Sequence, residues 1–344
     1  MAQAPLVIDG NEILPGTNVK FELPVAKLYT DSDVSLPIHV FRAKKPGPTI
    51  FISAAIHGDE LNGIEIIRRV ISNPKFKVLC GTLIAVPIVN VYGVVNQSRY
   101  MPDRRDLNRS FPGSAKGSLA SRVANKFLTE IVSKCDYGID LHTGAIHRSN
   151  LPQIRANLKD EETNHLAQLF GVPVVLNADI LEGSLREAAS HTKTKVLLYE
   201  AGEALRFDEF SIRAGVKGVK NILRHFGMLR KNKQKNPSCA VANSSKWYRA
   251  NASGIFNTKV KLGDKVEKGD VLAEIGSPYG TVINKVIAEK NGIIIGQQNI
   301  PLVQEGEAMF HIAFFSEEDD DIVEHIENVQ EQLLPELSGG LDQQ

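Results

Sequence analysis

The chain has 344 residues, 42% of them hydrophobic, and its 40 Lys and Arg balance its 40 Asp and Glu, so its formal net charge is zero. This balance gives no global reason to expect a nucleic acid or an anionic membrane as partner, and no apolar run approaches the about 20 residues of a membrane span. The three scattered cysteines predict neither a disulfide framework nor a thiolate metal site. The N-terminus lacks a signal-peptide pattern, so we expect a cytoplasmic protein.

Strand and helix signals alternate along the first two thirds of the chain. Short strands such as Val19–Leu23 and Leu36–Phe41 come first. Apolar runs then predict strands at 49–56, 81–89, 137–141, 173–177 and 195–200, and helical spacing predicts helices at 62–71, 119–131, 160–170, 184–191 and 209–226. This alternation predicts an α/β fold with a mostly parallel or mixed central sheet flanked by helices.

The composition changes after the last of these helices. Residues 230–237 are charged, contain no apolar residue and end in proline, which is typical of a linker. Short β segments with glycine turns follow and predict a small all-β domain. The chain ends with an acidic block and a polar segment, with a short helix near 322–334. We therefore divide the chain into a first domain with an N-terminal β segment (1–229), a linker (230–245), a β domain (246–315) and an acidic C-terminal tail (316–344).

His57 and Glu60 lie on the loop that ends the predicted strand 49–56. A histidine and a glutamate three residues apart can turn toward one ion, and His142, which closes the strand 137–141, offers a third ligand. Two histidines and one glutamate around an open fourth position form a catalytic zinc site. Both loops fall at the carboxyl ends of strands, where sites gather in parallel sheets. Asp140, on the same strand face as His142, can accept a hydrogen bond from its imidazole. The alternative is a loop histidine that caps a helix.

Glu200 ends the predicted strand 195–200 and is placed over the same edge of the sheet. A carboxylate there can deprotonate a metal-activated water and later protonate the leaving amine. Glu203 is the competing candidate, and we prefer Glu200 because it follows the apolar run directly. The alternative for Glu200 is a surface residue that starts a loop.

The segment Asp106–Gly113 contains Asn108 and Arg109, whose amide and guanidinium donors suit a substrate carboxylate. Three arginines stand just upstream, at Arg99, Arg104 and Arg105. One of them could stabilise the oxyanion that forms when water attacks a carbonyl. For Arg104 and Arg105, a solvated basic loop is the favoured interpretation.

Taken in order and spacing, four motifs resemble the succinylglutamate desuccinylase/aspartoacylase family: His57–Glu60, Asp106–Arg109, Asp140–His142 and Glu200–Gly202. The resemblance covers about residues 45–315. These proteins are zinc deacylases that share the metallocarboxypeptidase fold, and the resemblance implies the same fold for the first domain.

The resemblance also implies roles for site residues. It implies one zinc ion with His57, Glu60 and His142 as its ligands. It implies Glu200 as the general base/acid, and Asn108 and Arg109 as the pair that binds the substrate carboxylate. Arg99 is implied as the oxyanion-stabilising arginine because Arg99–Tyr100 matches the family's Arg-Tyr pair, although two extra residues separate it from Asn108 here. Arg186 falls where family members can place another substrate-contacting arginine; the alternative is an arginine on a helix surface.

The segment Val266–Ile275 resembles the lipoyl/biotinyl-carrier barrel. Carriers need a lysine at the tip of the following hairpin, and the tip here, Gly276–Gly280, has none. We therefore expect the shape of this fold without its cofactor, used to wall or gate the active-site cleft.

The activity implied is zinc-dependent hydrolysis, by metal-activated water, of the amide bond of an N-acyl amino acid or a related small N-acyl compound. This is a deacylase acting on carbon–nitrogen bonds other than peptide bonds. The acyl group stays open between acetyl, succinyl and others, and family analogy admits an N-acetyl-diamino acid. Two alternatives remain: a metallocarboxypeptidase acting on peptide C-termini, and a non-catalytic binding or scaffold protein with a retained fold. The expected partner is a small-molecule substrate, with no nucleic acid or membrane, and a homo-oligomer is compatible with the sequence.

Overall fold

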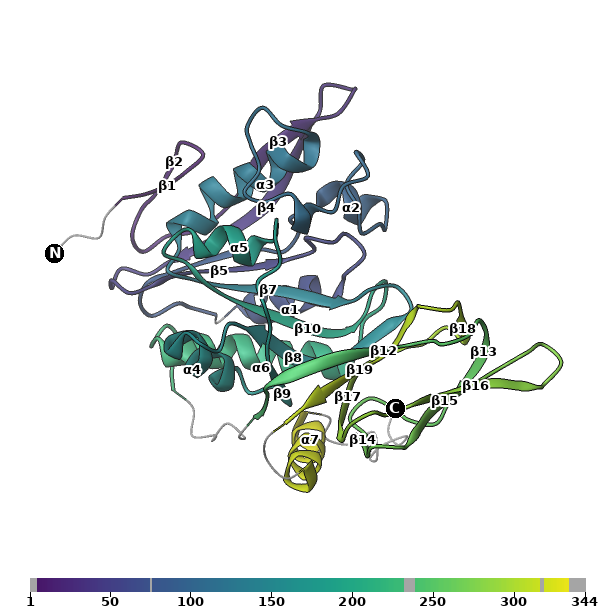
Figure 1. Ribbon diagram of the computed structural model, residues 1–344. Helices are drawn as coiled ribbons and strands as arrows, with labels where there is room; N and C mark the ends of the chain where they lie inside the picture. Colours follow the sequence, from purple (N-terminus) through teal and green to yellow (C-terminus); the bar gives the residue numbers. More distant parts are fainter. Residues whose placement is uncertain (1–4, 75, 232–238, 316–318, 334–344) are drawn as a thin grey trace, which may run out of the picture.

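The computed structural model describes residues 5–74, 76–231, 239–315 and 319–333. Its centre is a mixed β-sheet with 13 described strands (Figure 1). These strands are β3 (Asn18–Lys27), β4 (Asp33–Arg42), β5 (Thr49–Ala54), β6 (Thr82–Val86), β7 (Tyr137–Gly144), β8 (Arg148–Ala156), β9 (Val174–Asn177), β10 (Lys195–Glu203), β11 (Ala240–Ala242), β12 (Ser244–Arg249), β14 (Lys265–Val266), β17 (Gly292–Gln298) and β19 (Ala308–Phe314). Two short strands, β1 (Leu6–Ile8) and β2 (Asn11–Ile13), form a separate hairpin.

The sheet follows the order β12-β19-β17-β8-β10-β7-β5-β6-β4-β3, with β9 paired to β8, β11 to β9, and β14 to β17. Its central strands are parallel: β5 pairs with β6 and β7, and β7 pairs with β10. The strands on either side, β8 and β4, pair antiparallel with them. The parallel strands are covered on both faces, which explains why their sequences are nearly continuous apolar runs. The mixed α/β architecture is as predicted.

Helices cover both faces of this sheet. One face packs against α1 (Asn62–Ile71), α4 (Glu161–Phe170) and α6 (Glu209–His225), whose apolar residues share one core cluster. The other face packs against α3 (Leu119–Glu130) and α5 (Leu185–Ser190), which share a second cluster. The smaller elements are α2 (Val91–Val95) and two 3-10 turns, η1 (Leu107–Arg109) and η2 (Val132–Lys134).

The five main helices begin and end within one residue of the predicted ranges. Local chemistry explains four of the starts. Ser118, Asp160, Ser184 and Asp208 each precede a helix, and each side chain accepts a hydrogen bond from the backbone N–H three residues later. Such caps satisfy one of the backbone donors that a helix start leaves without an internal partner.

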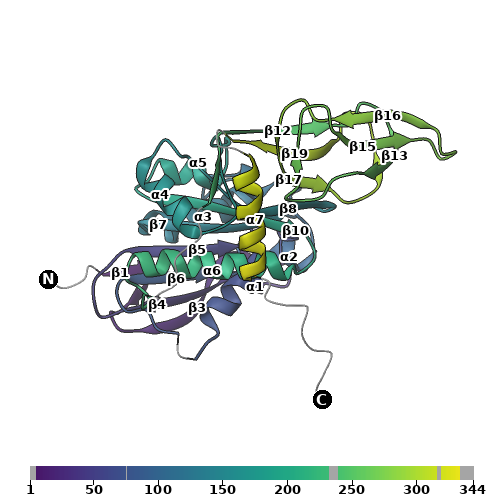
Figure 2. The ribbon, with the colours of Figure 1, turned by 90° about the horizontal axis from the view of Figure 1, so that it is seen from below.

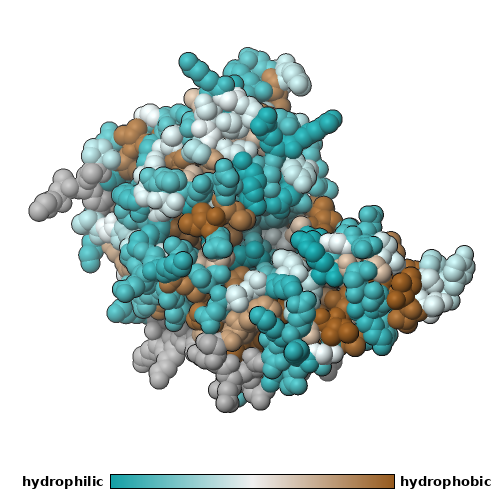
Figure 3. All heavy atoms as spheres, in the orientation of Figure 1, coloured by the Kyte–Doolittle hydropathy of each residue, from teal (hydrophilic) through white to brown (hydrophobic). Residues whose placement is uncertain are grey.

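A C-terminal all-β unit follows residue 239. It contains a four-stranded sheet of β13 (Gly254–Thr258), β15 (Val271–Gly276), β16 (Val282–Ile287) and β18 (Leu302–Val303). This sheet packs over β17 and β19, which are also strands of the central sheet, and Phe256, Leu272 and Phe310 contribute to their common core. Apolar side chains gather on the outside of this unit, on the right of Figure 3. Val282 and Leu302 are among the exposed apolar residues of the unit. An all-β unit is therefore present as predicted, while its likeness to a carrier barrel stays a prediction.

The strand β11 and the start of β12 fall within the interval predicted as a linker, 230–245, of which residues 232–238 lie outside the described residues. Within the predicted tail, residues 316–318 and 334–344 likewise lie outside them. Between these two stretches the chain forms α7 (Asp319–Leu333), where the sequence predicts a short helix. Figure 2 shows α7 lying across α6. Val329 is buried in the core cluster that includes α6, and Ile322 and Ile326 are buried in a cluster formed mainly by strand residues. Among the described helices, none is long and apolar enough to cross a membrane.

Candidate metal centre and active-site cavity

The carboxyl ends of three neighbouring strands place the predicted ligands at one edge of the sheet. His57 follows β5, His142 lies near the end of β7, and Glu200 of β10 is paired in register with His142. The loop after β5 is tight, and the backbone N–H of Glu60 donates to the carbonyl of His57 at 3.2 Å. A Cβ on Gly58 would lie 1.9 Å from the carbonyl carbon of Gly93 in α2, so this loop requires glycine at its second position.

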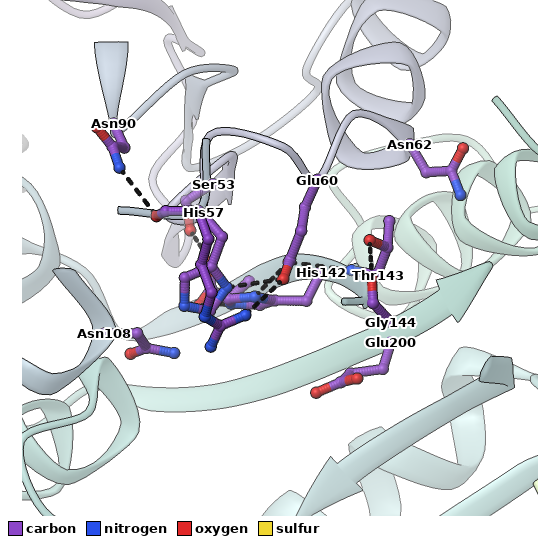
Figure 4. A network of polar contacts seen from close by, with 12 residues as sticks. Ser53, His57, Glu60, Asn62, Asn90, Asn108, His142, Thr143, Gly144 and Glu200 are labelled. Carbon is purple, nitrogen blue, oxygen red and sulfur yellow. Dashed lines mark hydrogen bonds and ion pairs between the residues drawn. The ribbon is translucent and has the colours of Figure 1, made fainter. Parts of the chain in front are cut away.

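His57, Glu60 and His142 converge, as predicted. One ligand atom from each lies within 4.8 Å of the others, and Figure 4 shows the three side chains turned toward one another. Nδ1 of His57 lies 2.8 Å from Oε1 of Glu60, and Nδ1 of His142 lies 2.8 Å from Oε2. All three side chains are buried.

The outward nitrogens of both imidazoles face carboxylates. Nε2 of His142 lies 2.8 Å from Oδ2 of Asp140, which is the contact expected from the sequence. Nε2 of His57 lies 3.0 Å from Oδ1 of Asp106. Ser53 in turn donates to the other oxygen of Asp140 at 2.7 Å. Carboxylates behind the imidazoles orient metal-binding histidines and make them better ligands.

The partner of His57 was not predicted from the sequence. Asp106 stands two residues before Asn108 in the motif that was singled out, and the available signal was a carboxylate inside that motif. The loop has no regular pattern of residues, so the orientation of the Asp106 side chain could not be predicted from the sequence.

The electrostatics of the cluster favour a cation. Burial opposes ionisation of Glu60, but the facing charges of His57 and His142 outweigh it and hold the pKa of Glu60 below its ordinary value. Burial acts against a charged His142, yet Asp140 and Glu60 raise its pKa well above the usual range. Three carboxylates thus surround two imidazoles. With both Nδ1 atoms and the Glu60 carboxylate pointing inward, this donor set fits a divalent metal ion.

All eight predicted site residues line one cavity of about 690 Å³. They are the three candidate ligands together with Arg99, Asn108, Arg109, Arg186 and Glu200. Figure 4 shows Asn108 and Glu200 on either side of the cluster. The cavity therefore brings the predicted metal site, base and carboxylate-binding pair together.

The two candidate bases have different surroundings. Glu200 lines the cavity, and its Oε2 accepts a hydrogen bond from Nδ2 of Asn150 at 2.7 Å. Glu203 is buried at the junction of β8 and β17, where its Oε1 accepts from the backbone N–H of His147 at 2.9 Å and its Oε2 from Nδ2 of Asn299 at 2.7 Å. Glu203 therefore holds two loops together, and Glu200 is the carboxylate available to a ligand.

The arginines of the site differ in their contacts. Arg99 lies beside the cluster, with Nη2 at 2.9 Å from Oδ2 of Asp106 and Nη1 at 3.3 Å from Oε1 of Glu60. Arg186 directs three of its N–H groups to backbone carbonyls of β8 and of residues 178 and 179. Arg104 and Arg105 are exposed, as a solvated loop requires.

Asn108 presents its amide nitrogen to the cavity because its oxygen is already engaged. Its Oδ1 accepts from the backbone N–H of Leu185 at 2.9 Å, at the start of α5. Nη1 of Arg109 donates to the backbone carbonyl of Asn108 at 2.6 Å, which anchors the guanidinium to the backbone of this turn. The pair thus offers N–H donors at one end of the cavity.

The C-terminal unit contributes to the wall of the cavity, with Trp247 of β12 and His311 of β19. Their rings are stacked, with centroids 4.6 Å apart and planes at 9°, and the guanidinium of Arg148 lies over the indole. Burial, with a contribution from the charge of Arg155, lowers the pKa of His311 to about 3, so the ring is neutral at neutral pH. No motif marked these residues in the sequence, because only the pairing of β12 with β19 brings them together.

A family model described as the succinylglutamate desuccinylase/aspartoacylase catalytic domain matches residues 46–226. The chain is 26% identical over 294 residues to an N-α-acetyl-L-2,4-diaminobutyric acid deacetylase from Halomonas elongata, covering 81% of this chain and 86% of that protein.

Solved structures share the fold. The product-bound ectoine utilization protein EutE (DoeB) from Ruegeria pomeroyi matches with a TM-score of 0.78 and 23% identity, over 90% of this chain and 98% of that one. A succinylglutamate desuccinylase/aspartoacylase from Rhodobacter sphaeroides matches with a TM-score of 0.77 and 21% identity, over 87% and 95%.

Proposed function

Because the chain belongs to the succinylglutamate desuccinylase/aspartoacylase family, we propose that it is a zinc-dependent hydrolase that cleaves the amide bond of an N-acyl amino acid or a related small N-acyl compound. The observation that carries this proposal is the single cavity lined by the His57–Glu60–His142 cluster, Glu200 and the Asn108–Arg109 pair. The similarity to a protein named as an N-acetyl-diaminobutyric acid deacetylase supports the same reaction class.

His57, Glu60 and His142 would hold the metal. Two imidazole nitrogens and one carboxylate oxygen are a donor set that suits zinc and leaves a position open. When bound, zinc supplies Lewis acidity, which polarises an amide carbonyl and lowers the pKa of a water molecule toward about 7. Asp106 and Asp140 fix the orientation of the two imidazoles from behind.

The remaining steps fall to residues of the chain. Glu200 takes a proton from the water that attacks the carbonyl carbon, and it returns this proton to the amine nitrogen as the carbon–nitrogen bond breaks. Arg99 stabilises the negative charge that develops on the carbonyl oxygen. The Asn108 amide and the Arg109 guanidinium bind a carboxylate of the substrate and so fix the amide bond relative to Glu200.

Arg186, which also lines the cavity, is proposed as a further substrate contact. Its bonds to three carbonyls hold the guanidinium in one orientation, and burial lowers the pKa of Arg186 from its ordinary value. A fixed cation at this place would favour an electronegative group of the substrate.

A small substrate is favoured over a peptide. Trp247 and His311 of the C-terminal unit line the cavity together with Asn108, and a wall built from this unit disfavours an extended chain. We propose that this unit has the shape of a carrier barrel and serves as a wall of the cavity. It carries no prosthetic group, since its hairpin tip has Tyr279 exposed and no lysine between Gly276 and Gly280.

The proposal is tested by an activity screen of the zinc-loaded protein. The panel contains N-acetyl-L-aspartate, N-succinyl-L-glutamate, N-α-acetyl-L-2,4-diaminobutyrate and a set of short peptides with free C-termini. We expect release of the acyl acid from at least one N-acyl amino acid and no release of C-terminal amino acids from the peptides. Hydrolysis of the peptides alone would replace the proposal with a carboxypeptidase, and inertness toward the whole panel would favour a binding protein.

A further inference from the structure

The carboxylate of Glu200 has a dedicated hydrogen-bond donor. Nδ2 of Asn150 in β8 donates to Oε2 of Glu200 at 2.7 Å, and Asn150 is only 5% exposed. Nη2 of Arg155 approaches the same oxygen at 3.8 Å. Because both donors approach Oε2, the other oxygen of Glu200, Oε1, is left for a ligand in the cavity.

An irregularity in β8 places Asn150 on the cavity face. Glu200 pairs with Gln153, and Gly202 pairs with Asn150, so β8 uses three residue steps where β10 uses two. In a regular ladder Leu151 would stand opposite Gly202, and Asn150 would face away from Glu200. The extra residue falls at Leu151-Pro152, and a bulge is a site where proline, which lacks an N–H, is tolerated in a sheet.

The C-terminal unit holds Asn150 from its other side. Gly296 of β17 pairs with Asn150 in register. A Cβ on Gly296 would lie 3.0 Å from Oδ1 of Asn150 and 3.0 Å from Cβ of His311. The bare glycine therefore lets β17 press against the Asn150 amide, and the neighbouring His311 closes the space beside it.

We propose that Asn150, held by β17 of the C-terminal unit, is the positioning residue for the Glu200 carboxylate. The C-terminal unit is then a part of the catalytic machinery as well as a wall of the cavity. This inference rests on the proposed function, since it presupposes that Glu200 is the base. It assigns the hydrogen bond at Oε2 the task of keeping the opposite oxygen aimed at the attacking water.

The test compares Asn150→Asp with Asn150→Ala. Aspartate has the shape of asparagine but places a second carboxylate against Glu200, whereas alanine removes the donor without adding charge. We expect kcat to fall about 10-fold or more in both variants, since small misplacements of reacting groups cost up to about 100-fold. Asn150→Asp should be no better than Asn150→Ala, with KM within about threefold and zinc content unchanged. A role in packing alone predicts a higher kcat for Asn150→Asp than for Asn150→Ala, because aspartate fills the space and alanine does not.

A second pair of variants probes the support from β17. Gly296→Ala pushes a methyl group toward Asn150 and should lower kcat by about threefold to 10-fold without a change in zinc content. Asn299→Ala is the matched control at the same junction. Nδ2 of Asn299 donates hydrogen bonds to Oγ of Ser149 at 2.6 Å and to Oε2 of Glu203 at 2.7 Å, and neither acceptor belongs to Glu200. This variant should therefore keep the wild-type kcat.

The outcomes separate this inference from the proposed function. An Asn150→Asp enzyme with wild-type kcat beside an inactive Glu200→Gln enzyme would overturn the positioning role and leave the base assignment standing. A fully active Glu200→Gln enzyme would overturn both. Crystal structures of the wild type and Asn150→Asp give a readout that does not depend on turnover. The Glu200 carboxylate should turn away from residue 150 in the variant, and an unchanged carboxylate would contradict the inference.

Discussion

Replacing Glu200 with glutamine removes the proposed base with little change to the structure. The two side chains have the same shape, the glutamine oxygen can still accept from Asn150, and no candidate metal ligand is touched. General-base catalysis contributes about 10²- to 10⁴-fold, which corresponds to about 3–5 kcal/mol of activation free energy at 1.36 kcal/mol per factor of ten. We therefore expect kcat to fall by that factor while bound zinc and the melting temperature stay at wild-type values.

The assay for Glu200→Gln is steady-state release of the acyl acid, with zinc measured by elemental analysis on the same sample. Glu203→Gln serves as the comparison, because Glu203 binds His147 and Asn299 outside the cavity. It should lose stability before it loses kcat. A Glu200→Gln enzyme that keeps near-normal kcat would refute the assignment, and so would a loss of activity explained fully by loss of metal.

Three further predictions concern the metal site, the cavity wall and a helix cap. Asp140→Asn should weaken zinc binding by about 10- to 100-fold, because the carboxylate behind His142 is lost; competition with a zinc chelator measures this, and unchanged affinity would contradict it. Trp247→Ala should raise KM for the best N-acyl substrate more than it lowers kcat, because it opens the wall without touching Glu200; an unchanged KM would remove Trp247 from the substrate site. Asp160→Ala should lower the free energy of unfolding at pH 7 by about 1 kcal/mol through loss of the α4 cap. Hydrogen bonds from Thr163 and Lys195 lower the pKa of Asp160 from 3.8 to about 2, so this stabilisation is present above pH 3.8 and is lost as the pH falls toward 2. Urea titrations of both proteins should therefore give a larger difference in the free energy of unfolding at pH 7 than at pH 2.5. An equal difference would contradict the cap.

The alternating elements of the first domain were readable from the sequence because the driving pattern is local. The strands β5, β6 and β7 are buried on both faces and appear as continuous apolar runs. The main helices carry apolar spacing, and four of them start at a capping residue. Since ligands gather at the carboxyl ends of such strands, the convergence of His57 and His142 could also be expected before the structure was seen.

The rest of the site depends on strand pairing that leaves no local signal. Asn150 reaches Glu200 only because β8 carries a bulge, and Trp247 meets His311 only because β12 pairs with β19. The same reason explains why Glu200 and Glu203 could not be separated with certainty by position along the chain: the register of β10 shifts between them. The burial of α7 was also not predicted. Acidic residues dominate the composition of the segment after residue 316, although Ile322, Ile326 and Val329 are buried.

If the proposed function is right, hydrolysis depends on a metal held by His57, Glu60 and His142. The direct measurement strips the protein with a chelator, adds zinc in steps, and records bound zinc and hydrolysis of the best N-acyl amino acid together, with His142→Ala as the control. We expect activity to rise in proportion to bound zinc and to saturate at a single ion per chain. We expect the control neither to bind zinc tightly nor to turn over substrate. Full activity in the stripped protein, or in His142→Ala, would contradict it.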